Sequence, residues 1–317
     1  MKFVAEISCS HAGAVLNALK IIDQLDPRYV DYVKFQAWTP ETMAVQYEID
    51  EGPWVGMDLQ ELYREAQTPP EWLSGLFQAT MARGMVPCAS VFDLGALERL
   101  EALDCPLYKI ASFEAVDLAL IEAVAMTEKP IVISTGQCAR HEIRSAVVTA
   151  LKWTEYVTLM HCVSEYPTSL EHANLRTMQA IKDQFPVKVG LSDHSYGSVV
   201  PIVAAAMGAS MIEKHVALDG LGLDSSFAMT PEQINEIACL SKQAVTTLGE
   251  IKFAEGGKLR RSLYFTQDIP KGTEIQGQHI KTARPNKGLS PLKIEKILGR
   301  VLTEDVFKDQ PVELRLV

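Results

Sequence analysis

The sequence predicts a (β/α)8 barrel followed by a small β-rich domain. Eight short apolar runs with strand-like composition occur in the first 217 residues, and most of them precede a stretch with helical periodicity. The runs contain few alternating polar residues, as expected of parallel strands buried on both faces. Eight regular βα units over about 250 residues are typical of a closed barrel. A doubly wound open sheet is the structural alternative, but it does not normally contain eight such units.

Each predicted strand and helix can be placed on the chain, and together they assign the barrel to residues 1–250. We expect strands at residues 3–8, 32–36, 86–91, 107–112, 130–135, 157–163, 187–193 and 211–217. We expect helices around residues 14–24, 71–83, 94–103, 117–127, 140–151, 174–184 and 197–207, and a last long helix over 231–249.

Three segments depart from this regular order. Residues 37–70 separate the second strand from its helix, and a loop of this length in a compact domain is typical of a lid or a binding loop. Residues 251–258 are expected to be a glycine-containing linker. The module at 259–317 is expected to contain a strand, a DIPKG turn, a second strand, a short helix over 291–298 and a last strand in VELRLV. Because so small a module buries little core alone, we expect it to dock on a barrel.

The composition is that of a globular protein with an excess of acidic residues. The 317 residues carry a formal charge of −10, which disfavours nucleic acids and anionic membranes as partners because both need a positive field. The six cysteines lack CxxC or CxH spacing, and the start MKFVAEIS lacks the features of a signal peptide. No apolar run has the roughly 18 to 20 residues of a membrane span. We therefore expect a cytoplasmic protein with reduced thiols, in which local cations hold any anionic substrate.

Polar residues gather at the carboxyl ends of the predicted strands, which is where barrels of this kind place their chemistry. One such residue alone would be interpreted as a satisfied core group. A structural protein, however, has no reason to bring buried charge from eight strands to one rim. The residues at the strand ends are Glu6, Lys34, Gln36, Ser90, Asp93, Lys109, Ser112, Glu114, Ser134, Thr135, His161, Ser164, Glu165, Tyr166, Ser192, Asp193, His194, Glu213, Lys214 and His215.

His194 and His215 end adjacent predicted strands, so their imidazoles are expected to lie close together. Two neutral imidazoles suit a divalent ion such as Mn, Fe, Co or Zn and leave positions open for substrate and water. The alternative is that each ring only hydrogen-bonds a backbone carbonyl, and spacing alone does not decide between the two. For His11 and His161 we expect a core or supporting role.

Lys34 and Lys109 lie within predicted strands, in YVKFQ and LYKIAS, and a buried lysine must be paired or bound to an anion. One hypothesis is a Schiff-base aldolase. The other is an anion site in which both ammonium groups and three serine hydroxyls hold a phosphate and a carboxylate. The hydroxyls favour the anion site, because a Schiff base needs one lysine and gains little from them. The serines are Ser112, Ser134 and Ser192.

Three carboxylates, Glu6, Glu114 and Asp224, are candidates for proton transfer or for binding sugar hydroxyls. Glu6 ends a strand, whereas Asp224, in GLGLDSSF, is equally interpreted as a loop-capping residue. The cysteines are expected to be buried small hydrophobes, since no His/Asn arrangement marks a thiol enzyme.

Eight segments of the chain together resemble the sialic acid synthase family. They are AEISCSHAG (5–13), VKFQ (33–36), YKIASFE (108–114), ISTG (133–136), HCVSEYP (161–167), GLSDHSYG (190–197), EKHVALD (213–219) and RRSL…DIPKG…ARPNKG (260–288). The resemblance covers nearly the whole chain and implies a (β/α)8 barrel followed by an antifreeze-like (SAF) domain. The segments DLQELYREAQTPPEW and YKIASFE…DLALIEAVA are most similar to the pseudaminic acid synthase branch. Where the family usually has Asn-His, this chain has Ser10-His11.

The resemblance implies an enzyme that condenses phosphoenolpyruvate (PEP) with an open-chain N-acetylated hexose. The implied products are phosphate and a nine-carbon 2-keto sugar acid of the pseudaminic acid type. A divalent metal is implied as cofactor, with Mn²⁺ expected first and Mg²⁺ or Co²⁺ as alternatives.

Site residues follow from the resemblance where the motifs match. Those implied for PEP binding are Lys34, Lys109, Ser112, Ser134, Ser164 and Ser192. The implied metal ligands are His194 and His215, and the implied catalytic residues are Glu6, Glu114 and His215. The residues implied to contact the sugar are Tyr166, Asp224 and Arg284. Arg284 is implied to reach the active site of the neighbouring subunit in a domain-swapped homodimer.

Other functions stay open at the level of sequence. They are an N-acetylneuraminate or legionaminate synthase that uses another aldose, a Schiff-base aldolase, and a non-catalytic carbohydrate-binding protein. The sequence does not specify the aldose, the native metal or the glycan that receives the product.

Overall fold

Eight parallel strands form a closed barrel in which each strand pairs with the next and the eighth pairs with the first. The computed structural model describes residues 1–50, 55–254 and 256–317. The strands are β1 (Lys2–Glu6), β2 (Tyr32–Ala37), β3 (Val86–Val91), β4 (Tyr108–Ile110), β5 (Ile131–Ser134), β6 (Val157–Cys162), β7 (Lys188–Asp193) and β8 (Met211–His215). The predicted barrel is therefore confirmed. The fourth strand is shorter than predicted, because only Tyr108–Ile110 pair regularly with the neighbouring strands.

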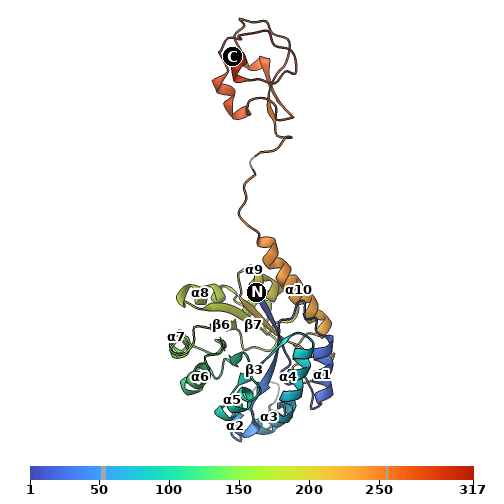
Figure 1. Cartoon of the computed structure of the whole chain (residues 1–317), viewed down its shortest axis with the longest axis vertical. Coiled ribbons are helices and arrows are strands. Elements are labelled where there is room, and N and C mark those ends of the chain that lie inside the picture. The colour runs from blue at the N-terminus through green and yellow to red at the C-terminus, as the bar shows by residue number, and fades with distance from the viewer. Residues whose placement is uncertain (51–54, 255) are drawn as a thin grey trace. The chain divides into compact units, whose positions relative to one another are not determined.

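Helices cover the outside of the strands (Figure 1). Several start at a side chain that accepts a hydrogen bond from a backbone N–H of the first turn, as Asp93, Asp117 and Thr230 do. These caps fix where each loop at the carboxyl end of a strand gives way to its helix. The helices are α1 (Val15–Gln24), α4 (Leu73–Ala82), α5 (Leu94–Glu101), α6 (Leu118–Ala125), α7 (Arg140–Ala150), α8 (Arg176–Gln184), α9 (Val199–Ala206) and α10 (Pro231–Leu248).

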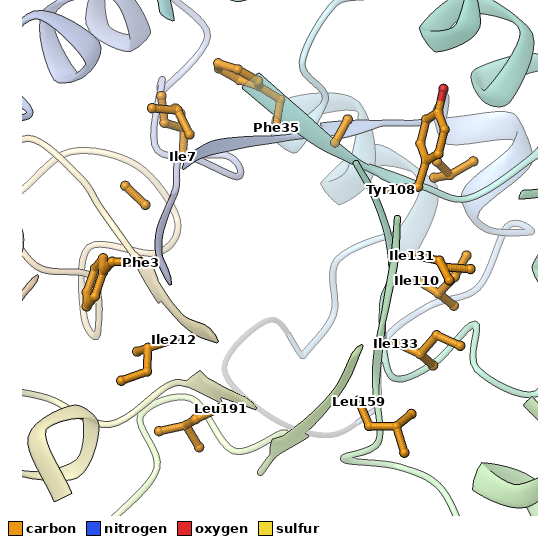
Figure 2. Close-up of a cluster of buried hydrophobic side chains, with 14 of the residues drawn as sticks. Phe3, Ile7, Phe35, Tyr108, Ile110, Ile131, Ile133, Leu159, Leu191 and Ile212 are labelled. Carbon is orange, nitrogen blue, oxygen red and sulfur yellow. The ribbon is translucent and has the colours of Figure 1, made fainter. Parts of the chain in front are cut away.

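The alternation of side chains along each strand separates an outer core from the barrel interior. Outward-pointing side chains pack under the helices, and Figure 2 shows ten of them labelled, among them Phe3, Phe35, Tyr108 and Ile212. Inward-pointing side chains at one level form a separate apolar cluster, which we call the apolar layer. It consists of Val4, Cys88, Leu107, Val132, Met160 and Met211.

A polar layer lies directly above the apolar layer, towards the carboxyl ends of the strands. Because side chains alternate with a period of two, the residue two positions after each member of the apolar layer points into the barrel again. Those residues are Glu6, Ser90, Lys109, Ser134, Cys162 and Glu213, and Lys34 and Ser192 take the same place on β2 and β7. The strand pattern thus closes one end of the interior with hydrocarbon and lines the other with polar groups.

The long segment 37–70 contains two short helices, α2 (Pro40–Met43) and α3 (Leu59–Ala66). Residues 51–54 of this segment lie outside the described residues. No described helix has the length and apolar composition needed to cross a membrane.

The chain divides into two units, Met1–Gly249 and Glu250–Val317. The second unit has its own apolar core around a two-stranded antiparallel sheet of β9 (Ser262–Phe265) and β10 (Ile280–Ala283). The described residues of the predicted linker, 251–254 and 256–258, contain no helix or strand.

Three predicted elements of the second unit are wrong in detail. The segment after the DIPKG turn makes only single bridges, and β9 pairs instead with β10. The helix expected over 291–298 is a 3-10 helix, Pro291–Lys296, and the strand expected in VELRLV gives way to a 3-10 turn, Leu314–Leu316. The physical reason is that short segments separated by frequent turns supply the buried residues of so small a core. Val312 and Leu316 are both buried, whereas Leu314 between them is exposed, and a strand would place all three on one face.

We predict that Gly190 on β7 cannot carry a side chain. A Cβ there would lie 2.3 Å from the carbonyl oxygen of Met211 on β8, so the backbone would have to shift. Gly190→Ala should lower the free energy of unfolding by at least the roughly 1–3 kcal/mol typical of an overpacked core, measured by urea unfolding. Gly75→Ala is the matched control, because a Cβ at Gly75 on α4 meets nothing within 4 Å. Equal stability of the two variants would contradict the prediction.

Candidate active site

The polar layer of the barrel interior is held together by buried ion pairs. Lys34 Nζ lies 2.9 Å from Glu6 Oε2 and 3.8 Å from Glu213 Oε1. Lys109 Nζ donates to both carboxylate oxygens of Glu213, at 3.0 and 3.2 Å. Glu213 also accepts a hydrogen bond of 3.0 Å from Ser192 Oγ. One carboxylate therefore joins two lysines that come from different strands.

These pairs decide the charges of the polar layer. Burial alone would raise the pKa of Glu213, but Lys109 and Lys34 hold that pKa well below its usual range. Burial alone would lower the pKa of Lys34, but Glu213 and Glu6 raise it above the ordinary lysine value. Lys34 is therefore kept as an ammonium ion, the form that binds anions and cannot attack a carbonyl.

A pocket of about 80 Å³ opens over the polar layer, and we call it the polar pocket. Five of the six residues predicted to bind PEP line it, and the sixth, Ser164, hydrogen-bonds the lining residue Ser112 at 3.1 Å between hydroxyl oxygens. The buried Ser134 hydroxyl has no nitrogen or oxygen partner among the described residues, so it can serve a ligand oxygen. The pocket is lined by Glu6, Lys34, Gln36, Ser90, Lys109, Ala111, Ser112, Phe113, Ser134, Cys162, Tyr166, Ser192, His194, Glu213 and His215.

The two predicted metal ligands meet at the edge of this pocket, with ring centroids 5.4 Å apart. His194 Nδ1 lies 2.8 Å from the carbonyl oxygen of Val163, and His215 Nδ1 lies 2.7 Å from Asp224 Oδ2. Both acceptors require a proton on Nδ1, so each ring, when neutral, presents its lone pair on Nε2. Burial, and to a lesser extent the nearby His215, lower the pKa of His194 to about 3, so this imidazole is neutral near pH 7.

Asp224 holds His215 through a hydrogen bond. Its Oδ2 accepts from His215, and its Oδ1 accepts from the Cys9 thiol, whose sulfur is 3.1 Å away. Both carboxylate oxygens are thus engaged within the protein. This arrangement gives Asp224 the role of orienting a histidine. Asp224 also lines the larger cavity described below, and its predicted contact with a sugar stays a prediction.

The histidine pair fits a divalent metal in one specific way. Among the described residues, no group of three or more His, Cys, Asp and Glu side chains is arranged to hold an ion. The two Nε2 atoms would therefore be the ligands that the protein supplies, and substrate and water would complete the coordination.

Glu114 and Glu6, both predicted to be catalytic, have different environments. Burial raises the pKa of Glu114 to about 7, and its Oε2 has no hydrogen-bond partner among the described residues. Glu6 instead lies beside Lys34 and accepts a hydrogen bond of 2.9 Å from Gln36 Nε2. Glu114 is suited to proton transfer near neutral pH, whereas Glu6 positions a lysine.

A larger cavity of about 610 Å³ adjoins the polar pocket, and we call it the apolar cavity. The segment 37–70 forms much of its wall, as expected of a binding loop. The two hollows share Gln36, Ala111, Phe113, Tyr166 and His215. The apolar cavity is lined by Ser8, Cys9, Gln36, Trp38, Met43, Tyr47, Ile49, Leu59, Leu62, Tyr63, Ala66, Phe92, Ala111, Phe113, Glu114, Tyr166, His215, Leu223, Asp224 and Phe227.

The remaining predicted residues lie where structural roles are expected, or in the other unit. His11 Nδ1 accepts from the backbone N–H of Gly13, and His161 Nε2 lies 2.8 Å from the carbonyl oxygen of Ala173. Arg284 is exposed and belongs to the second unit.

The roles of two residues in the site do not follow from the sequence analysis. Glu213 is among the polar residues at the strand ends, and the alternation in EKH places it on the same face as His215, but its partners are not evident. For Cys9 no sequence signal reveals the contact with Asp224, which is 215 residues away.

The fold and this site define a barrel enzyme with a lysine- and serine-lined pocket beside an apolar cavity. Residues 21–253 match the NeuB family, and residues 260–314 match the SAF domain. The chain belongs to the NeuB family. The enzymes of this family condense phosphoenolpyruvate with an aminosugar, and the chain is an enzyme of this class.

Similar proteins support the same family assignment. The chain is 38% identical to the pseudaminic acid synthase of Helicobacter pylori, over 98% of this chain and 96% of that protein. It is 33% identical to the pseudaminic acid synthase of Campylobacter jejuni, over 96% and 92% of the two chains. A crystal structure of N-acetylneuraminic acid synthetase from Leptospira borgpetersenii is 28% identical, with a TM-score of 0.73 over 80% of this chain and 87% of that one.

We predict that the buried Glu114 carboxyl makes stability fall as pH rises. Its pKa is about 7 when folded against an ordinary 4.5, so the folded state binds the proton more tightly than the unfolded chain. Its stabilising effect is complete below about pH 4.5 and is lost as pH rises through about 7. Glu114→Gln should therefore raise the free energy of unfolding at pH 8 by up to about 3 kcal/mol and change it little at pH 5, measured by urea unfolding. A difference that is the same at both pH values would contradict the raised pKa.

Proposed function

We propose that this chain condenses PEP with an open-chain N-acetylated hexose to give phosphate and a nine-carbon 2-keto sugar acid of the pseudaminic acid type. The observation that carries the proposal is the junction of the polar pocket with the apolar cavity at the carboxyl ends of the same strands. PEP would occupy the first and the hexose the second. Their reacting carbons would then meet beside the shared residues Gln36, Tyr166 and His215.

The polar pocket supports PEP as the anionic substrate. The ammonium groups of Lys34 and Lys109 have N–H donors for a phosphate and a carboxylate, and the hydroxyls of Ser112, Ser134 and Ser192 add neutral donors. Holding PEP and the aldehyde in register in this way can contribute about 7–11 kcal/mol to lowering the barrier.

The apolar cavity supports a hexose that carries methyl and N-acetyl groups. Its wall contains Trp38, Tyr63, Phe113 and Phe227, against which hydroxyl groups would lose hydrogen bonds to water. A deoxygenated, diacetamido sugar places apolar groups there instead. The two pseudaminic acid synthases at 38% and 33% identity favour this branch over the legionaminic acid synthases, which are 29% identical.

The reaction would proceed by attack of C3 of PEP on the aldehyde carbon. Glu114 would give its proton to the aldehyde oxygen as the carbon–carbon bond forms and recover one from the water that adds at C2 of PEP. The resulting tetrahedral centre collapses to a ketone, and phosphate leaves with the hydroxyl proton. The pKa of about 7 allows Glu114 to act in both directions near neutral pH.

A divalent metal, Mn²⁺ first and Mg²⁺ or Co²⁺ as alternatives, would be held by Nε2 of His194 and of His215 and would supply Lewis-acid polarisation of the aldehyde oxygen. Asp224 supports this assignment because it fixes the His215 tautomer. The Schiff-base alternative is disfavoured because both candidate lysines are paired with carboxylates. Glu213 and Glu6 hold Lys34 as an ammonium ion, and Lys109 lies 3.0 Å from Glu213.

We predict that the chain releases phosphate from PEP when a 2,4-diacetamido-2,4,6-trideoxyhexose is the second substrate. The kcat/KM for this sugar should exceed that for N-acetylmannosamine by at least about 100-fold. The measurement is phosphate release with a panel of both sugar types. Equal use of the two sugars would contradict the role given to the apolar cavity. Inactivation by pyruvate with borohydride would instead support a Schiff-base aldolase.

We predict that His194→Ala and His215→Ala each abolish Mn²⁺ binding, measured by calorimetry, while circular dichroism shows an intact fold. Each substitution removes one of the two protein ligands at a strand end, away from the apolar layer. The exposed His141 on α7 is the matched control, and His141→Ala should bind Mn²⁺ as the parent does. Undiminished Mn²⁺ binding in both site variants would overturn the metal assignment.

We further propose a domain-swapped homodimer in which Arg284 of one subunit serves the barrel of the other. Arg284→Ala and His215→Ala should each be nearly inactive as homodimers. After subunit exchange of an equal mixture, about a quarter of the sites should combine an intact barrel with an intact Arg284, and phosphate release should recover to that extent.

Arg300→Ala, an exposed arginine in the same unit, is the control and should keep its activity. No recovery in mixed dimers verified by mass spectrometry would mean that Arg284 does not act across subunits.

A further inference from the structure

A second cavity lies outside the barrel interior, bounded by α7, α8 and the ends of β5 and β6. Its volume is about 370 Å³, and we call it the α7–α8 cavity. It is lined by Thr135, Gly136, Cys138, Arg140, Ile143, His161, Cys162, Val163, Asn174, Thr177, Ala180, Ile181, Gln184 and Phe185. The mechanism proposed above gives this cavity no role.

The chemistry of the lining favours a small anion. Arg140 is the cation of the cavity, and it has no ion-pair or hydrogen-bond partner among the described residues. No Asp or Glu is among the lining residues, and the nearby Glu142 carboxylate accepts from the backbone N–H of Ala139 at 2.6 Å, at the start of the helix. In a chain of net charge −10, an unpaired guanidinium in a hollow is a local site for negative charge.

The rest of the lining favours an anion that also carries apolar and hydrogen-bonding groups. Ile143, Ile181 and Phe185 provide hydrocarbon surface, while Thr177 and Gln184 provide a hydroxyl and an amide. A guanidinium matches a carboxylate with two parallel N–H donors. An acylated sugar acid combines these features: one carboxylate, several hydroxyls and the methyl groups of its acyl substituents.

The wall of the α7–α8 cavity is also the wall of the polar pocket. Cys162 lines both hollows. The Cys138 thiol lies 3.6 Å from the carbonyl oxygen of Ser112, a residue of the polar pocket. At Gly136 a Cβ would lie 2.6 Å from Cys162 Sγ and 2.8 Å from Ser164 Oγ, so the wall is tightly packed there. A ligand that presses on this wall therefore moves the serines that face PEP.

We propose that the α7–α8 cavity is a regulatory site for an acylated sugar acid. The carboxylate of the acid pairs with Arg140, and its binding lowers the affinity of the polar pocket for PEP. The choice of this acid rests on the proposed function, because the enzyme's own product belongs to this chemical class. By thermodynamic linkage, PEP must weaken binding of the acid by the same factor.

The first experiment locates the site without using activity. N-acetylneuraminic acid serves as the probe, its methyl ester as the uncharged control and inorganic phosphate as the control for charge alone. The rate at which N-ethylmaleimide alkylates Cys138 is followed by mass spectrometry of the peptide that contains it. We expect the acid to slow this alkylation at least fivefold and both controls to leave it unchanged. Equal protection by the methyl ester would overturn the pairing with Arg140.

Variants separate this cavity from the catalytic site. Arg140→Ala should weaken protection by the acid at least tenfold, whereas Arg144→Ala, an exposed arginine on the same helix that does not line the cavity, should change it less than twofold. Ala180→Trp should fill the cavity and abolish the effect of the acid with an unchanged thermal unfolding midpoint. An Arg140→Ala protein that is protected like the parent would overturn the site.

The second experiment measures coupling to PEP. The KM for PEP should rise with N-acetylneuraminic acid and level off at a finite factor, and the rise should be absent in Arg140→Ala. An unlimited linear rise that persists in Arg140→Ala would mean competition in the polar pocket and would overturn regulation. If no aldose supports phosphate release, the proposed function fails, while Cys138 protection still decides whether the cavity binds the acid.

Discussion

The site depends on one buried carboxylate, Glu213, which bridges Lys34 and Lys109 inside the barrel. Burying a charge costs several kcal/mol unless it is paired and hydrogen-bonded, and removing one partner leaves the others uncompensated. With Glu6 as the second anion, the layer holds two cations and two carboxylates in register. The barrel thereby holds two lysine side chains out of bulk water beside carboxylates, as the proposed binding of an anion requires. Neutral lysines would be less costly to bury but would bind phosphate poorly.

The period of two along each strand makes this arrangement compatible with a stable barrel. The same strands that place Glu6, Lys109 and Glu213 in the polar layer place Val4, Leu107 and Met211 two residues earlier in the apolar layer. The apolar layer excludes water from below, and the outward-facing side chains of the same strands pack under the helices. The lower dielectric strengthens each ion pair of the polar layer. The packing that stabilises the barrel therefore also strengthens the electrostatic interactions in the pocket.

Environment gives chemically similar groups different roles at the rim. Glu213, between lysines, has a pKa below the usual range, whereas Glu114, half-buried and without a partner for its Oε2 among the described residues, has one of about 7. The first stays an anion that organises cations, and the second can exchange a proton near neutral pH. His194 and His215 likewise present Nε2 because Val163 and Asp224 engage the other nitrogen.

The sequence by itself determined the barrel, its eight strands, and the group of polar residues at their carboxyl ends, because periodicity and composition are local properties of a strand or helix. Tertiary structure alone decided which of these residues are partners. Glu213 meets Lys109 across 104 residues, and Cys9 meets Asp224 across 215, through closure of the barrel between β8 and β1 and the path of the loop after β8. In the second unit it also decided that β9 pairs with β10, since a small core is built from contacts between distant turns and not from strand patterns. Local patterns specify which face a side chain takes, but only the closed fold specifies what lies opposite it.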